Sequence, residues 1–426
     1  MRNDSRRHIL LGSAALVAIA IGGASPALAQ TENSGNPNDS AASGAGVQTA
    51  SAEDETIVVT GFRGALESAV AEKKNRDQVV ESISAEDIGK LPDASIAESI
   101  ARLPGLTSQR VSGRSNSISI RGFSPDFSTT LLNGREQTST GDNRAVEYDQ
   151  YPSEVISQVL VYKTPMASLV GQGLSGTVDM RTIRPIAYGR RALSVGGRAT
   201  YSDLGKLNAG SNDKGWRVNA TYVDQFADDT FGVALSASYN DEPYQIQEFN
   251  AWGYAGTTAA GPPFVIGGTK SYVTSTQMKR LGLQGTLEWR PTPNITTTFD
   301  AFYSDFKDYQ IKRGVELPLA FSPAVLGARQ ASGDFVTSGS FSNVEGVVRN
   351  DAFRRHAKLY SFGWNGAWKG DDGWSAMADI SLSKTDRNEL VLESNAGTGR
   401  GQGVGAVDTV SFTSGNGGTR FANTLN

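Results

Sequence analysis

Residues 281–289 read Leu281-Gly-Leu-Gln-Gly-Thr-Leu-Glu-Trp289, with apolar residues and glycine alternating with polar ones from Leu283 onward. Successive side chains of a β-strand point to opposite faces, so this stretch predicts a strand with one apolar and one polar face. An aromatic residue ends the apolar face. Such strands are typical of barrels in the bacterial outer membrane, although a soluble β-sandwich also alternates.

The same alternation recurs from residue 192 onward. We expect strands at 192–203, 215–226, 230–241, 277–290, 295–309, 356–370 and 373–386. Their connections are short at 227–229, 291–294 and 371–372, and long at 204–214, 242–276 and 310–355. Short turns on one side and long loops on the other are the arrangement of outer-membrane barrels. The connections therefore favour a transmembrane antiparallel β-barrel over a sandwich.

The number of these strands is too small for a closed transporter barrel. Bacterial barrels have even strand numbers, and plugged transporters have about 22. We therefore expect residues 186–426 to be a partial β-barrel of about seven strands, and the chain to be a truncated N-terminal fragment.

Residues 62–185 predict a compact α+β domain. Helical spacing runs from Phe62 to Lys73, and a second helix places Ile96, Ile100 and Leu103 on one face. Strands are expected at 79–83, 117–121, 129–132, 158–163 and 176–183, with a hairpin turn at 133–134, which is Asn-Gly. A soluble periplasmic binding module is the alternative interpretation of this part.

The N-terminus has the features of a secretory signal. Arg2, Arg6 and Arg7 precede the apolar run Ile9–Gly23, and Ala27-Leu28-Ala29 predicts cleavage, so residues 1–29 are expected to be a signal peptide. Residues 30–54 are polar and rich in Gly, Ser and Ala, which predicts a disordered tether.

The tether leads to Glu55-Thr-Ile-Val-Val-Thr-Gly61, a run of mainly β-branched residues that favours an extended backbone. Nothing nearby in the sequence is expected to pair with it. Such a segment can add itself as a strand to the sheet edge of another protein.

This segment and five motifs after it resemble the TonB-dependent outer-membrane receptors. The motifs are Leu91-Pro-Asp-Ala-Ser-Ile-Ala-Glu-Ser-Ile100, Leu103-Pro-Gly105, Ile118-Ser-Ile-Arg-Gly122, Leu132-Asn-Gly-Arg135 and Gly171-Gln-Gly-Leu-Ser-Gly-Thr-Val-Asp179. They occur in the order expected for the family, and their sequences are similar to those of the receptors of Caulobacter and its relatives.

The resemblance implies the organisation and the activity. Residues 55–61 would be the TonB box, residues 62–185 a plug domain, and the function active uptake of a nutrient through the outer membrane. The implied partners are TonB and outer-membrane lipid. A passive porin-like barrel with an occluding domain is the alternative. The residues expected to bind TonB are Glu55, Thr56, Ile57, Val58, Val59 and Thr60.

Two further sets of residues are expected to be functional. Aromatic residues of the expected loop 242–276 offer flat faces for a small-molecule or oligosaccharide ligand, with a saccharide favoured and a siderophore–iron complex as the other choice. These are Tyr244, Phe249, Trp252 and Tyr254. The resemblance also implies contacts between plug and barrel at Arg121, Arg181 and Glu288.

Composition excludes several other functions. The chain of 426 residues has no Cys and only two His, so thiolate chemistry and a His-rich metal site are not expected. A formal net charge of −4 argues against a nucleic-acid partner. No nucleophile–base pair is evident in the sequence. We therefore expect neither an enzyme nor a bound cofactor.

Overall fold

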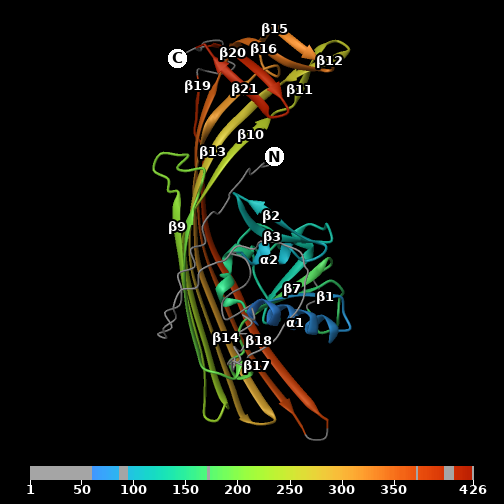
Figure 1. Cartoon of the computed structure of the whole chain (residues 1–426), viewed down its shortest axis with the longest axis vertical. Coiled ribbons are helices and arrows are strands. Elements are labelled where there is room, and N and C mark those ends of the chain that lie inside the picture. The colour runs from blue at the N-terminus through green and yellow to red at the C-terminus, as the bar shows by residue number, and fades with distance from the viewer. Residues whose placement is uncertain (1–59, 86–94, 170–172, 371–372, 398–406, 425–426) are drawn as a thin grey trace, which may run out of the picture.

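The computed structural model describes residues 60–85, 95–169, 173–370, 373–397 and 407–424. An N-terminal α+β domain lies against one face of a large curved sheet, and a smaller sheet covers one end of it (Figure 1). The expected signal peptide, the tether and residues 55–59 lie outside the described residues. None of the helices in the described ranges is both long and apolar enough to cross a lipid bilayer.

The N-terminal domain contains a five-stranded sheet with the order β1-β6-β7-β4-β5 and a separate hairpin, β2–β3. Its elements are α1 (Thr60–Lys74), β1 (Val80–Ser84), α2 (Ile96–Ala101), β2 (Leu106–Val111), β3 (Arg114–Ile120), η1 (Pro125–Phe127), β4 (Ser128–Leu132), β5 (Arg135–Glu136), η2 (Tyr148–Gln150), η3 (Ser153–Val155), β6 (Gln158–Tyr162), β7 (Gly176–Arg181) and α3 (Pro185–Tyr188). Each strand expected in this domain is present. Thr60, expected at the end of an extended segment, instead begins α1, since the helix extends two residues before Phe62, where the helical spacing begins.

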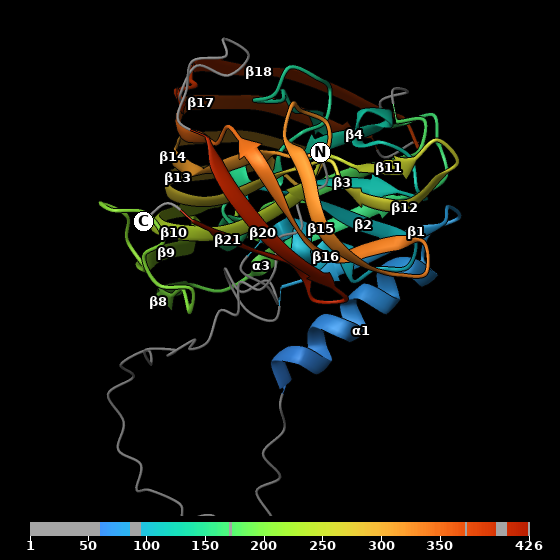
Figure 2. The same cartoon turned by 90° about the horizontal axis from the view of Figure 1, so that it is seen from above.

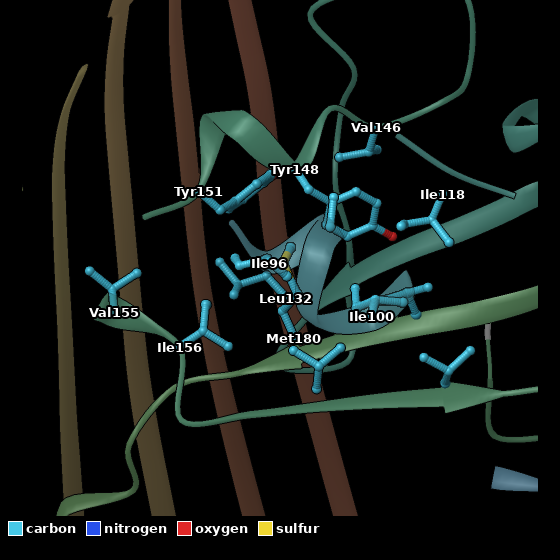
Figure 3. Packing of buried hydrophobic residues seen from close by; sticks show 14 of the residues in the cluster. Ile96, Ile100, Ile118, Leu132, Val146, Tyr148, Tyr151, Val155, Ile156 and Met180 are labelled. Carbon is cyan, nitrogen blue, oxygen red and sulfur yellow. The ribbon is translucent and has the colours of Figure 1, made fainter. Parts of the chain in front are cut away.

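The core of this domain is built around α2. Ile96 and Ile100 are fully buried and face Ile118 of β3, as the helical spacing predicts. Tyr148 and Tyr151 close the core, and Tyr151 lies on the side of the core that faces the large sheet (Figure 3). The domain therefore has a hydrophobic core of its own as well as a face turned to the sheet.

The large sheet is an antiparallel meander with the strand order β18-β17-β14-β13-β10-β9-β8. Its strands are β8 (Ala192–Tyr201), β9 (Lys214–Phe226), β10 (Phe231–Ala251), β13 (Gly268–Thr292), β14 (Ile295–Pro318), β17 (Val347–Lys369) and β18 (Ser375–Leu392), with β19 (Asn395–Gly397) pairing to β17. All the strands expected after residue 192 are present. Among the described strands the sheet is open, since β8 and β18 each have one neighbour along this path.

The two faces of the large sheet differ as the alternation predicts. On β13, Gln284 and Glu288 are buried on the inner face, which holds the N-terminal domain. Leu283, Leu287 and Trp289 are exposed on the opposite, outer face. The sequence pattern thus identified the side of the sheet that carries the domain.

The expected long loops are shorter than predicted and contain more strand. β10 continues to Ala251 and β13 begins at Gly268, while β14 continues to Pro318 and β17 begins at Val347. Beyond the apolar stretch these strands are polar on both faces, so the sequence no longer alternates. The expectation that 242–276 and 310–355 are loops is therefore wrong at both ends.

What remains of these connections, together with two strands that follow β19, forms a second sheet, here called the cap sheet, seen from above in Figure 2. Phe341 and Phe412 stack 5.6 Å apart in its hydrophobic core. Its strands are β11 (Tyr254–Thr258), β12 (Gly261–Ile266), β15 (Val325–Ser332), β16 (Phe335–Val344), β20 (Asp408–Gly415) and β21 (Gly418–Asn423).

Candidate functional site

A tight turn projects Arg135 of the N-terminal domain into the large sheet. Asn133 and Gly134 both have positive φ, 54° and 80°, and join β4 to β5 with Leu132 opposite Arg135. This is the backbone that an Asn-Gly hairpin turn favours. Arg135 Nη1 donates to Asp300 at 2.7 Å, and its Nε donates to Asp379 at 2.9 Å. The sequence expectation of a turn here is confirmed, and the turn positions a cross-domain ion pair.

The Arg135 cluster is buried and includes a second arginine. The side chain of Arg135 is 6% exposed, and Arg184 Nη1 donates to Asp300 Oδ1 at 3.0 Å. Burial alone would lower the pKa of Arg135, but its hydrogen bonds to Asp379 and Asp300 outweigh it and raise that pKa. A buried charge that loses its partner is strongly destabilising. This cluster therefore holds the domain in a defined position.

Arg114, at the start of β3, makes a second cross-domain cluster. It donates to Asp149 of its own domain at 3.1 Å and to Asp308 of β14 at 2.9 Å. The guanidinium carbon lies 5.4 Å from the centre of the Tyr244 ring, a cation–π distance. Burial lowers the pKa of Arg114, but Asp308 and Asp149 overcome this and raise it. Its charge is thus fixed at all ordinary pH values.

A third cluster links η3 to β9 and β10. Arg217 donates to Glu154 at 3.0 Å and to Glu242 at 3.0 Å. Burial raises the pKa of Glu154, but the nearby Arg217 and Arg280 outweigh it, so the pKa is lowered and the carboxyl stays ionised. Arg280 also donates to the backbone oxygen of Tyr151 at 3.3 Å.

Apolar and hydroxyl contacts fill the interface between these clusters. Tyr151 stacks on Phe302 of β14 with ring centres 5.1 Å apart. Thr138 bonds to the hydroxyls of Ser383 and Thr385 on β18 at 3.2 and 2.7 Å. The interface between the domain and the large sheet therefore combines buried charge pairs with apolar and hydroxyl contacts.

The residues expected to join the two parts have other partners. Arg181 donates to Asp179 of its own domain at 3.0 Å. Glu288 accepts a hydrogen bond from the backbone nitrogen of Ile186 at 2.9 Å. Arg121 is exposed in a turn after β3, with a positive φ of 55°, and points to no ion-pair partner in the described residues. The expected pairing of these arginines with Glu288 is therefore corrected: Glu288 does contact the N-terminal domain, but through the backbone of α3.

The aromatic residues expected to bind ligand do not form one group. Tyr244 lies on the inner face of β10 against Arg114, and Phe249 lies further along β10 with its ring 6.5 Å from Phe421. Tyr254 is on the cap sheet, 53% exposed, edge-to-face with Phe335 at 5.9 Å. Trp252 packs over Gly268. Tyr244 and Phe249 are thus strand residues rather than loop residues.

A polar cleft of about 790 Å³ opens beside the Arg135 cluster, between the domain and the large sheet. Its lining includes Asn133, Arg135, Asp179, Arg184, Asn365 and Asp379. The ion pairs of Arg135 form part of its wall, so a movement of β5 would change its size.

The sequence of this domain has a known counterpart. Residues 72–178 match the family model described as TonB-dependent Receptor Plug Domain. This part of the chain is a plug domain. The plug domain thus includes Arg114, Arg135, Asp149 and Glu154, and the large sheet supplies the residues that bind them.

Two of the similar proteins are, by name, a receptor and an outer-membrane protein. The chain is 24% identical over 378 residues to the ferric enterobactin receptor of Pseudomonas aeruginosa, covering 82% of this chain and 44% of that receptor. It is 29% identical over 139 residues to the iron-regulated outer membrane virulence protein of Vibrio cholerae, covering 31% of this chain and 20% of that protein. A crystal structure of a mutant ferric enterobactin receptor from Pseudomonas aeruginosa aligns with a TM-score of 0.40 and 13% identity, covering 83% of this chain and 60% of that one.

The residues that hold the plug domain against the large sheet are not among those expected from the sequence. Asp300 and Asp308 occupy inner positions of an alternating strand, where a charge must find a partner inside the molecule. A charged residue at an inner strand position is therefore a signal in the sequence for a buried ion pair. What no sequence pattern indicated is which arginine of the plug domain each one binds.

Proposed function

We propose that the chain is part of a TonB-dependent transporter that takes up an external ligand across the bacterial outer membrane. The observation that carries this proposal is a plug domain seated by buried ion pairs on the inner face of a sheet with an apolar outer face. Ion pairs of this kind hold the plug domain against the sheet, and the domain would block passage of the ligand until energy is supplied to break them. TonB, engaging residues 55–61, would be the source of that energy.

The outer face supports placement in a membrane. On β13 the apolar stretch from Leu281 to Trp289 is about 26 Å long at about 3.3 Å per residue. At a tilt of about 40° it reaches about 20 Å along the membrane normal, near the apolar band of about 25 Å in such barrels. Aromatic residues lie at both ends of this band, with Phe231 opposite Trp289 at one end and Tyr239 opposite Leu281 at the other.

The open edges of the large sheet support a larger barrel. Backbone groups without partners cost several kcal/mol each in lipid, so β8 and β18 need further neighbours in a membrane. The chain spans 44% of the length of the Pseudomonas receptor named above. We propose that the described strands are one part of a closed wall. A Caulobacter-type subfamily remains a prediction.

For the ligand, we propose a ferric chelate rather than the saccharide favoured by sequence. The names of the relatives support this choice, since they are a ferric enterobactin receptor and an iron-regulated protein. The exposed ring of Tyr254, beside Phe335, offers a face for a flat aromatic chelator.

Deleting residues 55–61 from the complete natural protein tests the proposal against a passive barrel. We expect uptake of a radiolabelled ferric chelate to be lost while its binding to cells is retained. Surface labelling of a loop confirms that the variant reaches the membrane. Uptake that continues unchanged would favour the passive porin-like alternative, and a protein that never enters the membrane would contradict both.

A further inference from the structure

Small residues on the outer face of the large sheet create a hollow in the apolar band. Its floor includes Ala237, Gly285 and Ala301, on three neighbouring strands, and its volume is about 490 Å³. The rim is apolar and is formed by Leu193, Tyr222, Leu235, Leu283, Tyr303 and Phe362. A flat barrel wall would be filled by larger side chains at these floor positions.

A second hollow continues the first toward β18. It has a volume of about 520 Å³ and shares Leu235, Gly285, Ala301 and Phe362 with the first. It extends to Trp364, Ile380 and Leu382. Together the two hollows make one apolar groove across the strands, here called the outer groove.

A row of basic side chains, here called the cation row, crosses the same strands beyond the groove. Lys279 lies directly opposite Lys307, and Lys307 lies opposite His356. All three are on the outer face, because their neighbours Arg280 and Asp308 point inward to the plug domain. Like charges directly opposite each other destabilise a strand pair, so the facing pair of Lys279 and Lys307 has a cost that nearby anions reduce.

The carboxylates nearby offset only part of this charge. Asp241 pairs with Lys279 at 2.9 Å, and Asp305 lies 3.1 Å from His356 and 3.9 Å from Lys307. Asp386 is opposite Lys358 in the register, but it pairs with Lys384.

Two cations of β17, one an arginine and one a lysine, add to the row. Arg354 and Lys358 alternate with inner residues and so also face outward. Neither has an ion-pair partner among the described residues. The outer face thus carries an excess of positive charge on β14 and β17, directly beyond the outer groove.

We propose that the groove and the cation row together bind one phosphorylated, multi-acyl lipid of the outer leaflet. Its phosphates contact Lys307, Arg354 and Lys358, and an acyl chain lies in the outer groove. Tyr303 and Tyr360, with ring centres 5.2 Å apart, lie between the two regions, where amphipathic rings are favoured at a membrane surface. This site rests on the membrane placement proposed above, and it is separate from the ligand pathway on the inner face.

Lipid retained by the purified protein tests the site. The complete natural protein, in detergent, is mixed with bisphosphorylated hexa-acyl lipid A, and bound lipid is counted by native mass spectrometry. The triple variant Lys307→Gln/Arg354→Gln/Lys358→Gln should retain at least tenfold less lipid. Ala301→Leu, which fills the floor of the groove, should also lower retention. The matched controls are Arg329→Gln on the cap sheet and Ala376→Leu, at an exposed outer-face position of β18 that does not line the groove.

Each outcome separates this site from the transport proposal. Heat-modifiable migration shows whether each variant has a folded barrel. A folded protein that binds lipid A equally well in the triple variant, or in which inorganic phosphate competes fully, overturns the lipid site while leaving transport intact. A complete protein that remains outside bilayers overturns the membrane placement and this site together.

Discussion

Arg135 Nε donates to Asp379 at 2.9 Å, which ties a two-residue strand of the plug domain to a strand 244 residues further along the chain. The same guanidinium donates to Asp300 at 2.7 Å. One side chain therefore bridges β14 and β18, on either side of β17, and fixes where the plug domain sits along the sheet.

Removing this bridge should loosen the plug domain. In Arg135→Ala, Asp379 loses its arginine and Asp300 keeps only Arg184, so we expect the attachment of the plug domain to be weaker by about 3 kcal/mol, the low end for a broken buried pair. The measurements are the urea midpoint for release of the plug domain and the leakage of a large antibiotic into cells. Arg135→Lys should be intermediate, since lysine cannot make the forked contact.

Arg110→Ala is the matched control for this prediction. Arg110 pairs with Glu98 at 3.1 Å, but its side chain is 50% exposed, and exposed pairs contribute under ~1 kcal/mol. Equal leakage from the two variants would show that the Arg135 cluster does not hold the domain.

The sequence predicted the strands well where turns and alternation mark them. The tight turns near residues 227–229 and 291–294 end β9 and β13 within a few residues of the expected bounds. At the opposite ends the prediction failed, because residues such as Gln245 and Gln247 continue β10 without an apolar face. The cap sheet was missed for the same reason, since its core forms only when separate connections meet.

The sequence could predict that ion pairs form at the candidate site, but not which residues pair with each other. A charged residue on the inner face, such as Asp308, indicates that it needs a partner inside the molecule. Its partner Arg114, however, lies 194 residues away in the sequence. A single sequence holds no local pattern for such a pair. The resemblance led to Arg121 and Arg181, whereas the plug-domain arginines that form ion pairs with the sheet are Arg114, Arg135 and Arg184.

Acid should weaken the attachment of β1 to its neighbours. Glu81 contacts Lys73 at 2.7 Å and Lys163 at 3.1 Å. Burial raises the pKa of Glu81, but the hydrogen bonds from Lys73 and Lys163 outweigh it and lower the pKa below its ordinary value. A lowered folded pKa stabilises the fold above the unfolded pKa of about 4.3, and this contribution is lost as the pH falls through the folded value.

Hydrogen exchange in β1 measures this effect in the complete protein. Glu81→Gln should speed exchange of Val80–Ser84 at pH 7, and the difference from the natural protein should shrink at pH values below the folded pKa. Glu67→Gln, at an exposed position of α1, is the control. A difference that does not depend on pH would contradict the ionic origin of the contact.

The exposed ring pair of the cap sheet should contribute to ligand affinity. Tyr254→Ala removes a face that stands beside Phe335, and we expect the affinity for a ferric catecholate chelate to fall by roughly fivefold, the scale of one aromatic contact of about 1 kcal/mol. Binding is measured by quenching of protein fluorescence. Tyr201→Ala, another exposed ring that lies on β8 rather than on the cap sheet, should bind normally. An equal loss in both variants would show that the cap sheet has no special part in binding.

Proline at position 58 should separate transport from ligand binding. An added strand is held mainly by backbone hydrogen bonds, and proline removes one backbone donor and restricts φ. We therefore expect Val58→Pro to abolish binding of the periplasmic domain of TonB and to stop uptake, while the chelate still binds at the surface. Val58→Ala keeps the donor and should lose far less. Pull-down of TonB with both variants, beside surface binding of the chelate, gives the comparison. If alanine were as harmful as proline, the contact would depend on the side chain, and residues 55–60 would not dock as a strand.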